Sequence, residues 1–318
     1  MVYASLILIG LVLSRIIFIF SKRILFEENI FTFNNICSNC NTAVTGKIFF
    51  PLTNYKCNNC KLSILPNCLI SDITSVLILV MVYYKFNATV SFIPLVIFAY
   101  FLLSASITDF WSKLIPHDIT YPAIIIGLVY AYFIKNDVMP ALAGIGVSYI
   151  LFDFIAFYGH KIYIKMHANE LEHILAQNEV ASIEEIEVMG GADAVLSAVI
   201  ASFLGLNSLV LALVIAFLVG AVLGAIYLGI EMYKQKIMHL AIKPVLLTAI
   251  VTGAVALLLF SALSSVFNVS FWTFYQPLIF FVLAGALLGL LGSGTKISKP
   301  FPFGPALAIG GVIAMLII

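Results

Sequence analysis

The sequence predicts an all-α polytopic membrane protein with about eight to ten transmembrane helices. Hydrophobic residues make up 63% of the 318-residue chain and charged residues only 10%, and the mean hydropathy is +1.13. Soluble globular chains carry about 25% charged residues, so the composition excludes a soluble fold. Apolar stretches of about 20 residues recur along the whole chain, as expected for several membrane spans. The implied partner is the lipid bilayer, and a net charge of +1 does not indicate a nucleic-acid partner.

Ten apolar segments are candidate spans. The first, residues 3–20 within the N-terminal segment 1–20, lacks the basic start and the small-residue cleavage site of a signal peptide, so we expect a retained helix. The others are residues 69–84, 92–108, 119–134, 138–158, 194–206, 208–230, 244–265, 271–292 and 303–318. The sixth of the ten is short, so it is either a tilted helix or a half-span tucked against its neighbours.

The basic residues predict which loops face the cytoplasm. If residues 21–68 are cytoplasmic, thirteen lysines and arginines fall in cytoplasmic gaps, which include the loop 159–192, and two fall in the opposite gaps. Cytoplasmic loops of membrane proteins are enriched in basic residues, so this bias predicts the orientation. Asp109 at the end of the third span and Asp193 at the start of the sixth then share the cytoplasmic side, where they could face each other across the helix bundle.

Four cysteines in the predicted cytoplasmic loop indicate a metal site. Cys37 pairs with Cys40 and Cys57 with Cys60 in two Cys-x-x-Cys motifs, with sixteen residues between the motifs. Two such knuckles can present four thiolates tetrahedrally, and thiolate is a preferred ligand of Zn²⁺. We therefore expect a small zinc-ribbon-like loop that holds a structural zinc. The alternative is a pair of disulfides or uncoordinated thiols.

Asp109 and Asp193 are the candidate catalytic residues. Hydrolysis by paired carboxylates needs one ionised acid, which takes a proton from water, and one protonated acid, which donates to the carbonyl oxygen. Proximity keeps both acids from ionising at once, so the pair shares a proton. Gly190 and Gly191 leave room for a substrate backbone to approach. The structural alternative for Asp193 is a helix cap, because an apolar run follows it directly.

Three stretches of the sequence resemble the type IV prepilin peptidases, which are membrane aspartyl proteases of the GxGD type. The stretch "DFWSKLIPHDITYP", which starts at Asp109, is similar to the family's D-x-x-x-x-x-I-P-(N/D)-x-L-T pattern. The stretch "GGADAVLSAVIASFLG" at 190–205 is similar to the G-x-G-D segment, and "PFGPALAIGG" at 302–311 resembles the last helix with its PFGP motif. The paired Cys-x-x-Cys loop matches the bifunctional members of the family.

The resemblance implies a function. It implies that Asp109 and Asp193 form the catalytic pair of an endopeptidase of the bacterial plasma (inner) membrane, with the site facing the cytoplasm. Its substrates would be type IV prepilins or pseudopilins of pilus and type II secretion systems, cut at the class III leader before the hydrophobic segment. Residues 69–318 would form the peptidase domain. Many family members also methylate the new N-terminus with S-adenosylmethionine, an activity associated with the cysteine-containing region 21–68.

The chain departs from the family pattern in four respects. Ala192 replaces the second glycine of G-x-G-D, and Val195 replaces the lysine that follows. Loss of that positive charge predicts that Asp193 is the more easily protonated of the two acids. Residues 240–292 resemble an added helix pair. The first span lacks a clear form of the family's asparagine- and arginine-containing motif, which weakens the case for methylation.

Two other classes of function fit the same composition. One is a non-enzymatic relative that acts as a membrane scaffold in pilus or secretion assembly, and the other is a transporter that uses intramembrane acids. Transporters place such acids near the bilayer midplane beside broken helices. Asp109 and Asp193 are instead predicted at the rim of the bilayer, which favours a protease.

Overall fold

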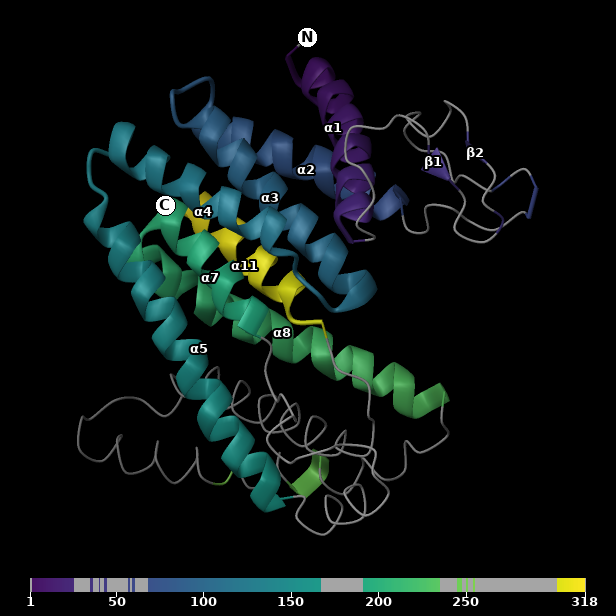
Figure 1. The fold of residues 1–318 in the computed structure, drawn as a ribbon, viewed down its shortest axis with the longest axis vertical. Helices are drawn as coiled ribbons and strands as arrows, with labels where there is room; N and C mark the ends of the chain where they lie inside the picture. Colours follow the sequence, from purple (N-terminus) through teal and green to yellow (C-terminus); the bar gives the residue numbers. More distant parts are fainter. Residues whose placement is uncertain are drawn as a thin grey trace. The chain divides into compact units, whose positions relative to one another are not determined.

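The structure of the chain is a computed structural model. It describes residues 2–25, 35–36, 40, 43–44, 57, 59–60, 68–166, 191–234, 245–247, 250, 254 and 302–317. Almost all of these residues lie in helices (Figure 1), which confirms the predicted all-α membrane fold. The predicted spans 244–265 and 271–292, the added pair 240–292 and the predicted loop 159–192 lie wholly or mostly outside the described residues.

The described helices follow the apolar segments of the sequence. They are α1 (Val2–Leu25), α2 (Cys68–Phe86), α3 (Phe92–Ser112), α4 (His117–Phe133), α5 (Met139–Met166), α7 (Gly191–Leu204), α8 (Leu206–Lys234) and α11 (Gly304–Ile317). Two strands of two residues each, β1 (Asn35–Ile36) and β2 (Ala43–Val44), pair antiparallel within the cysteine-containing loop. The candidate acids lie on α3 and α7.

Five of the described helices are long and apolar enough to cross a membrane. They are α1, α2 from Leu69, α3, α5 up to Tyr158, and α8. Helices α7 and α11 are apolar but have only 14 residues each. At 1.5 Å per residue such a helix is about 21 Å long, which is shorter than a hydrocarbon core of about 30 Å. The short sixth segment therefore fits the tucked half-span better than the tilted span.

The chain divides into two compact units, Met1–Ala216 with Pro302–Ile318, and Phe217–Phe301. In the first unit, α7 is packed against α3, α4, α5 and α11, and every residue from Ala194 to Leu204 is buried. Figure 1 shows α11, in yellow, lying among the helices of this unit. A helix buried on all sides can be apolar on all sides, which explains the uninterrupted apolar run after Asp193.

Glycines on three different helices let α7 pack closely. A methyl group added to Gly144 of α5 would lie 2.9 Å from Cβ of Ala201, and one added to Gly127 of α4 would collide with Ser202. On α11, a methyl group on Gly311 would lie 2.9 Å from Leu102 Cδ1 of α3 and 3.1 Å from Ile200 Cγ1 of α7. Small residues are what allow membrane helices to approach this closely.

A buried ion pair joins α1 to α2. Arg15 Nη2 donates to Asp72 Oδ2 at 2.7 Å, and both side chains are 1% exposed. Ser14 Oγ donates to Asp72 Oδ1 at 2.7 Å. Within the described part of the chain, Nε and Nη1 of Arg15 have no hydrogen-bond partner. The carboxylate of Asp72 is thus the group that compensates the buried guanidinium charge.

Replacing Asp72 by alanine should destabilise the protein, because the Arg15 guanidinium would stay buried without its partner. Breaking a buried pair in this way typically costs about 3–5 kcal/mol. The midpoint of thermal unfolding of the purified protein in detergent should fall accordingly. The double variant Arg15→Met with Asp72→Leu removes both charges and should recover most of the loss. A double variant as unstable as Asp72→Ala would show that the charge of Arg15 is not the cause.

Candidate active site

Asp109 lies in the last turn of α3, and its backbone is part of the helix end. Lys113 caps the helix in a left-handed conformation with φ of 59°, and its N–H donates to the Asp109 carbonyl oxygen at 2.9 Å. A left-handed residue followed within a few positions by a proline, here Pro116, is a common way to end a helix. The Asp109 side chain is only 6% exposed, so its carboxyl group needs polar partners inside the protein.

Asp193 lies in the first turn of α7, where the helix dipole favours a carboxylate. Its side chain is half-buried, so it is more accessible than Asp109. Gly191 is exposed, and apart from its own helix no atom of the described residues lies within 4 Å of the position that a side chain would take there. Among the described residues, the approach to Asp193 is therefore open on the Gly191 side. Gly190, the other predicted backbone-approach residue, lies outside the described residues.

The two acids lie at one level of the helix bundle. Gly311 packs between Leu102 of α3 and Ile200 of α7, and these three residues form one layer of the bundle. Asp109 is seven residues from Leu102, and Asp193 is seven residues from Ile200. Seven residues are two helical turns, or about 10.5 Å, and residues i and i+7 lie on the same helix face. Asp109 follows Leu102 in α3 and Asp193 precedes Ile200 in α7, so the two acids lie beyond the same side of the layer when these helices run in opposite directions, and the action of one acid on the other supports this direction. The charge of Asp109 acts on the Asp193 carboxyl group, as expected for neighbouring acids.

The first residue of α11 touches Asp109 directly. The backbone N–H of Gly304 donates to Asp109 Oδ2 at 2.7 Å. A methyl group added to Gly304 would lie 2.7 Å from the same oxygen and 3.0 Å from Asp109 Cγ. The motif PFGP marks this helix start in the sequence, but a contact made by a backbone N–H cannot be read from residue types.

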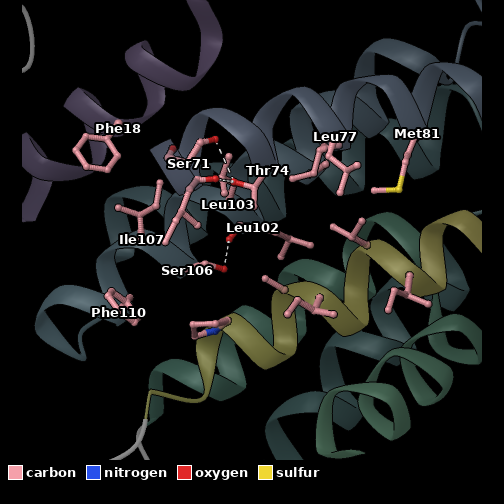
Figure 2. A pocket seen from close by; sticks show the side chains of 18 of the residues that line it. Phe18, Ser71, Thr74, Leu77, Met81, Leu102, Leu103, Ser106, Ile107 and Phe110 are labelled. Atoms are coloured by element: carbon pink, nitrogen blue, oxygen red, sulfur yellow. Dashed lines mark hydrogen bonds between the residues drawn. The ribbon is translucent and has the colours of Figure 1, made fainter. Parts of the chain in front are cut away.

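An apolar groove borders this site. It has a volume of about 460 Å³ and is lined by α2, α3 and α11 together with Phe18 of α1. Figure 2 shows side chains of α2 and α3 facing α11 across the groove. The lining includes Ile107 and Phe110 on either side of Asp109 in sequence, and Pro305, which follows Gly304. The groove therefore runs from the interior of the unit to the turn of α3 that carries the acid.

Three of the four predicted zinc ligands come together. The sulfur atoms of Cys40, Cys57 and Cys60 lie within 4.8 Å of one another, and the Cys40 and Cys57 sulfurs are 3.4 Å apart. Ligands held tetrahedrally at Zn–S distances of about 2.3 Å lie about 3.8 Å from each other, so three cysteines are close enough to bind a metal. The fourth predicted ligand, Cys37, lies outside the described residues.

The chemistry of Cys57 also suits a metal ligand. The backbone N–H of Cys60, followed by that of Asn59, lowers the pKa of the Cys57 thiol to about 6, although burial acts against this. The thiolate is the form that binds metals. The Cys57 side chain packs with Phe18 of α1 and Trp111 of α3, and the two aromatic rings meet edge to face at 4.7 Å. The cysteine cluster thus rests on the same end of α3 as Asp109.

Other acids of the apolar segments do not share this arrangement. Asp72 is part of the ion pair with Arg15, and Asp153 on α5 is exposed. Asp118 is exposed in the first turn of α4, where the helix dipole favours its charge. Asp118 does not cap α4 with its side chain, because Pro116 holds the N-cap position and no side-chain cap bond is made.

Comparison with known proteins identifies the segment that contains both acids. Residues 96–225 match the model of the type IV leader peptidase family. This range runs from the first turns of α3 to the middle of α8, and it includes Asp109 and Asp193. No curated protein and no solved structure matches the chain. The match covers 130 of the 318 residues, implies a peptidase and confirms the resemblance predicted from the motifs: residues 96–225 are similar to the type IV leader peptidase family.

Proposed function

We propose that the chain is an aspartyl endopeptidase that removes the leader of type IV prepilins or pseudopilins, with Asp109 and Asp193 as its catalytic pair. The observation that carries the proposal is the convergence of the two acids at one level beside the start of α11, inside the segment that matches the family. Asp109 is enclosed and Asp193 is open on the Gly191 side. Such a pair can hold one proton between them and still meet water and substrate.

The reaction needs only the two acids and a water molecule. The ionised acid takes a proton from water, and the water oxygen forms a bond to the carbonyl carbon of the scissile peptide. The protonated acid gives its proton to the carbonyl oxygen, which yields a neutral gem-diol. The gem-diol then collapses: the C–N bond breaks, the amine nitrogen takes up a proton, and the pair returns to its starting protonation state. The products are the leader's new carboxyl end and the new N-terminus of the substrate.

The site is proposed to face the cytoplasm from the inner membrane. The basic residues predict that the loop 21–68 is cytoplasmic. Cys57 in that loop forms a small hydrophobic cluster with Phe18 and Ile19, and Trp111, two residues from Asp109, packs against this cluster. Contact between the loop and this end of α3 supports a common side for the cysteine cluster and the acids.

The apolar groove is proposed to hold the substrate's hydrophobic segment. Its lining is almost entirely apolar, and the hydroxyl groups of Thr74 and Ser106 are bonded to backbone carbonyls of their own helices. An almost entirely apolar lining suits an apolar helix. Because the groove reaches the turn that holds Asp109, a segment lying in it would bring the adjoining leader to the acids.

The cysteine cluster is proposed to hold a structural zinc through Cys37, Cys40, Cys57 and Cys60. A site closed by four thiolates has no open position for catalysis, so zinc would stabilise the loop and take no part in hydrolysis. Methylation of the new N-terminus with S-adenosylmethionine stays a prediction of the resemblance alone. The divergent first span counts against it.

The peptidase reading is favoured over the two alternatives. A transporter would place its acids in broken helices near the bilayer midplane, whereas Asp109 and Asp193 lie in the terminal turns of α3 and α7. A scaffold has no use for two acids at one level, one of them half-buried beside open space. The family match also implies a peptidase.

Asp109→Asn and Asp193→Asn should each abolish cleavage of a prepilin-type substrate by the purified protein in detergent. Loss of a general acid or base typically lowers the rate by about 100- to 10,000-fold. Asp153→Asn removes an exposed acid of α5 and should cleave at the wild-type rate. Cleavage that survives in either active-site variant, with folding intact, would exclude that aspartate from catalysis.

Leu77→Trp should weaken substrate binding without slowing the chemical step. Leu77 lines the groove from α2 and is 54% exposed, so a larger ring can enter the groove. We expect KM to rise roughly 10-fold, equivalent to about 1.4 kcal/mol of lost apolar contact, with little change in kcat. The control is Ile73→Trp, which changes a 62% exposed residue one turn away that does not line the groove. Equal KM values for the two variants would argue against the groove as the binding site of the substrate's hydrophobic segment.

The purified protein should contain about one zinc ion per chain, as measured by plasma mass spectrometry, because four thiolates form a closed structural site. Cys57→Ser should lose most of this zinc, since it removes a central ligand of the cluster. Cys68→Ser, which lies outside both Cys-x-x-Cys motifs, should keep it. A wild-type protein without zinc would favour the disulfide or thiol alternative.

A further inference from the structure

The backbone N–H groups at the very start of a helix lack the regular acceptor four residues earlier. In α11, the N–H of Leu307 makes the first regular bond, to the Phe303 carbonyl oxygen at 3.1 Å, and the N–H of Ala306 donates to the same oxygen at 3.0 Å. Pro305 has no N–H. The N–H of Gly304 donates outside the helix, to Asp109 Oδ2 at 2.7 Å. The side chain of Asp109, from another helix, thus takes the place that a helix's own N-cap residue usually fills.

This bond favours the ionised form of Asp109. A distance of 2.7 Å lies at the short end of the range for an N–H donor and a carboxylate. The positive end of the α11 dipole points at the same oxygen, and the ammonium charge of Lys113 also acts on this carboxyl group. Burial is the largest influence on this carboxyl group and opposes its charge, and the Gly304 N–H and the Lys113 charge act in the opposite direction.

Asp193 has a different environment. Asp193 lies in the first turn of α7, whose dipole favours a charged carboxylate. No group of the described residues donates to its carboxyl group, however, and burial and the charge of Asp109 both act against its charge. The first carboxyl group to ionise is therefore Asp109, and its charge disfavours ionisation of Asp193. One proton shared by the pair then resides on Asp193.

We infer that Gly304 is a positioning residue whose backbone N–H holds Asp109 ionised and correctly oriented as the general base, which leaves Asp193 as the general acid. The inference rests on the proposed two-acid function and assigns the role of each acid. With Oδ2 bonded to Gly304, Oδ1 of Asp109 is the oxygen that takes the proton from water. Glycine is required because any side chain would occupy the space of that carboxylate, as the 2.7 Å contact of an added methyl group shows.

The first test is Gly304→Ala against Gly146→Ala. A methyl group at 304 meets the carboxylate itself, whereas Gly146 is an exposed residue of α5, and apart from its own helix no atom among the described residues lies within 4 Å of a methyl group added there. Gly304→Ala should lower kcat on a prepilin substrate about 10- to 100-fold, because displacing a catalytic group by about 1 Å is costly, and should leave KM unchanged. Gly146→Ala should keep kcat within about threefold of wild type, because the added methyl group meets no neighbour.

A second variant removes the donor without adding an atom. Replacing the amide before Gly304 by an ester, through glycolic acid in cell-free translation, deletes the N–H and avoids any steric clash. Loss of a hydrogen bond to a charged group should lower kcat about 10- to 100-fold. If Gly304→Ala fails to fold, the ester variant still tests whether the Gly304 N–H positions Asp109. Wild-type kcat in the ester variant, or a raised KM with kcat unchanged, would overturn the positioning role.

Infrared spectroscopy tests the assignment independently of cleavage. At neutral pH, Asp109→Asn should remove a carboxylate band and Asp193→Asn a protonated-carboxyl band. The reverse pattern would overturn the assignment of base and acid. A wild-type protein that cleaves no prepilin would refute the proposed function. A wild-type protein that cleaves, with the ester variant equally active, would refute only the role of Gly304.

Discussion

The packing of Gly311 between Leu102 and Ile200 is the contact on which the geometry of the site depends. A helix is stiff and rises 1.5 Å per residue, so fixing three helices in one layer also fixes their positions two turns away. Asp109, Asp193 and Gly304 are each seven residues from that layer. Their common level thus follows from apolar packing deeper in the bundle, where small residues allow close approach, and needs no contact between the acids themselves.

One physical rule accounts for both of the buried acids among the described residues of the first unit. A charged group excluded from water must be compensated inside the protein. Asp72 meets this need through Arg15 and has no open side, so it joins two helices. Asp109 meets it through a backbone N–H, which compensates the charge only in part and leaves one oxygen unbonded to Gly304. The half-buried Asp193 and the open space at Gly191 lie nearby. The fully paired Asp72 is suited to holding two helices together, and the partly compensated Asp109 is suited to proton transfer.

The sequence predicted the helices well, because a membrane span must be a continuous apolar run with internal backbone bonds. The predicted segments 92–108 and 194–206 begin and end within about four residues of the observed ends of α3 and α7. It could also single out the two acids, since carboxylates are rare in such runs. It could not pair Arg15 with Asp72, because helix packing decides which residues meet. Nor could it find the Gly304 N–H, because every residue except proline carries that group. The extension of α5 to Met166 was likewise not visible in hydropathy.

The departures from the family pattern agree with the environment of Asp193. Ala192, in place of the second glycine of the motif, packs against the main hydrophobic core, so its methyl group leaves the open side at Gly191 untouched. Val195, in place of a lysine, is buried. A lysine there would need a buried partner and would favour an ionised Asp193. The valine provides no such charge, whereas Asp109 has the α11 start and Lys113 beside it. The substitution at 195 and the bond to Gly304 thus bias the shared proton in the same direction, toward Asp193.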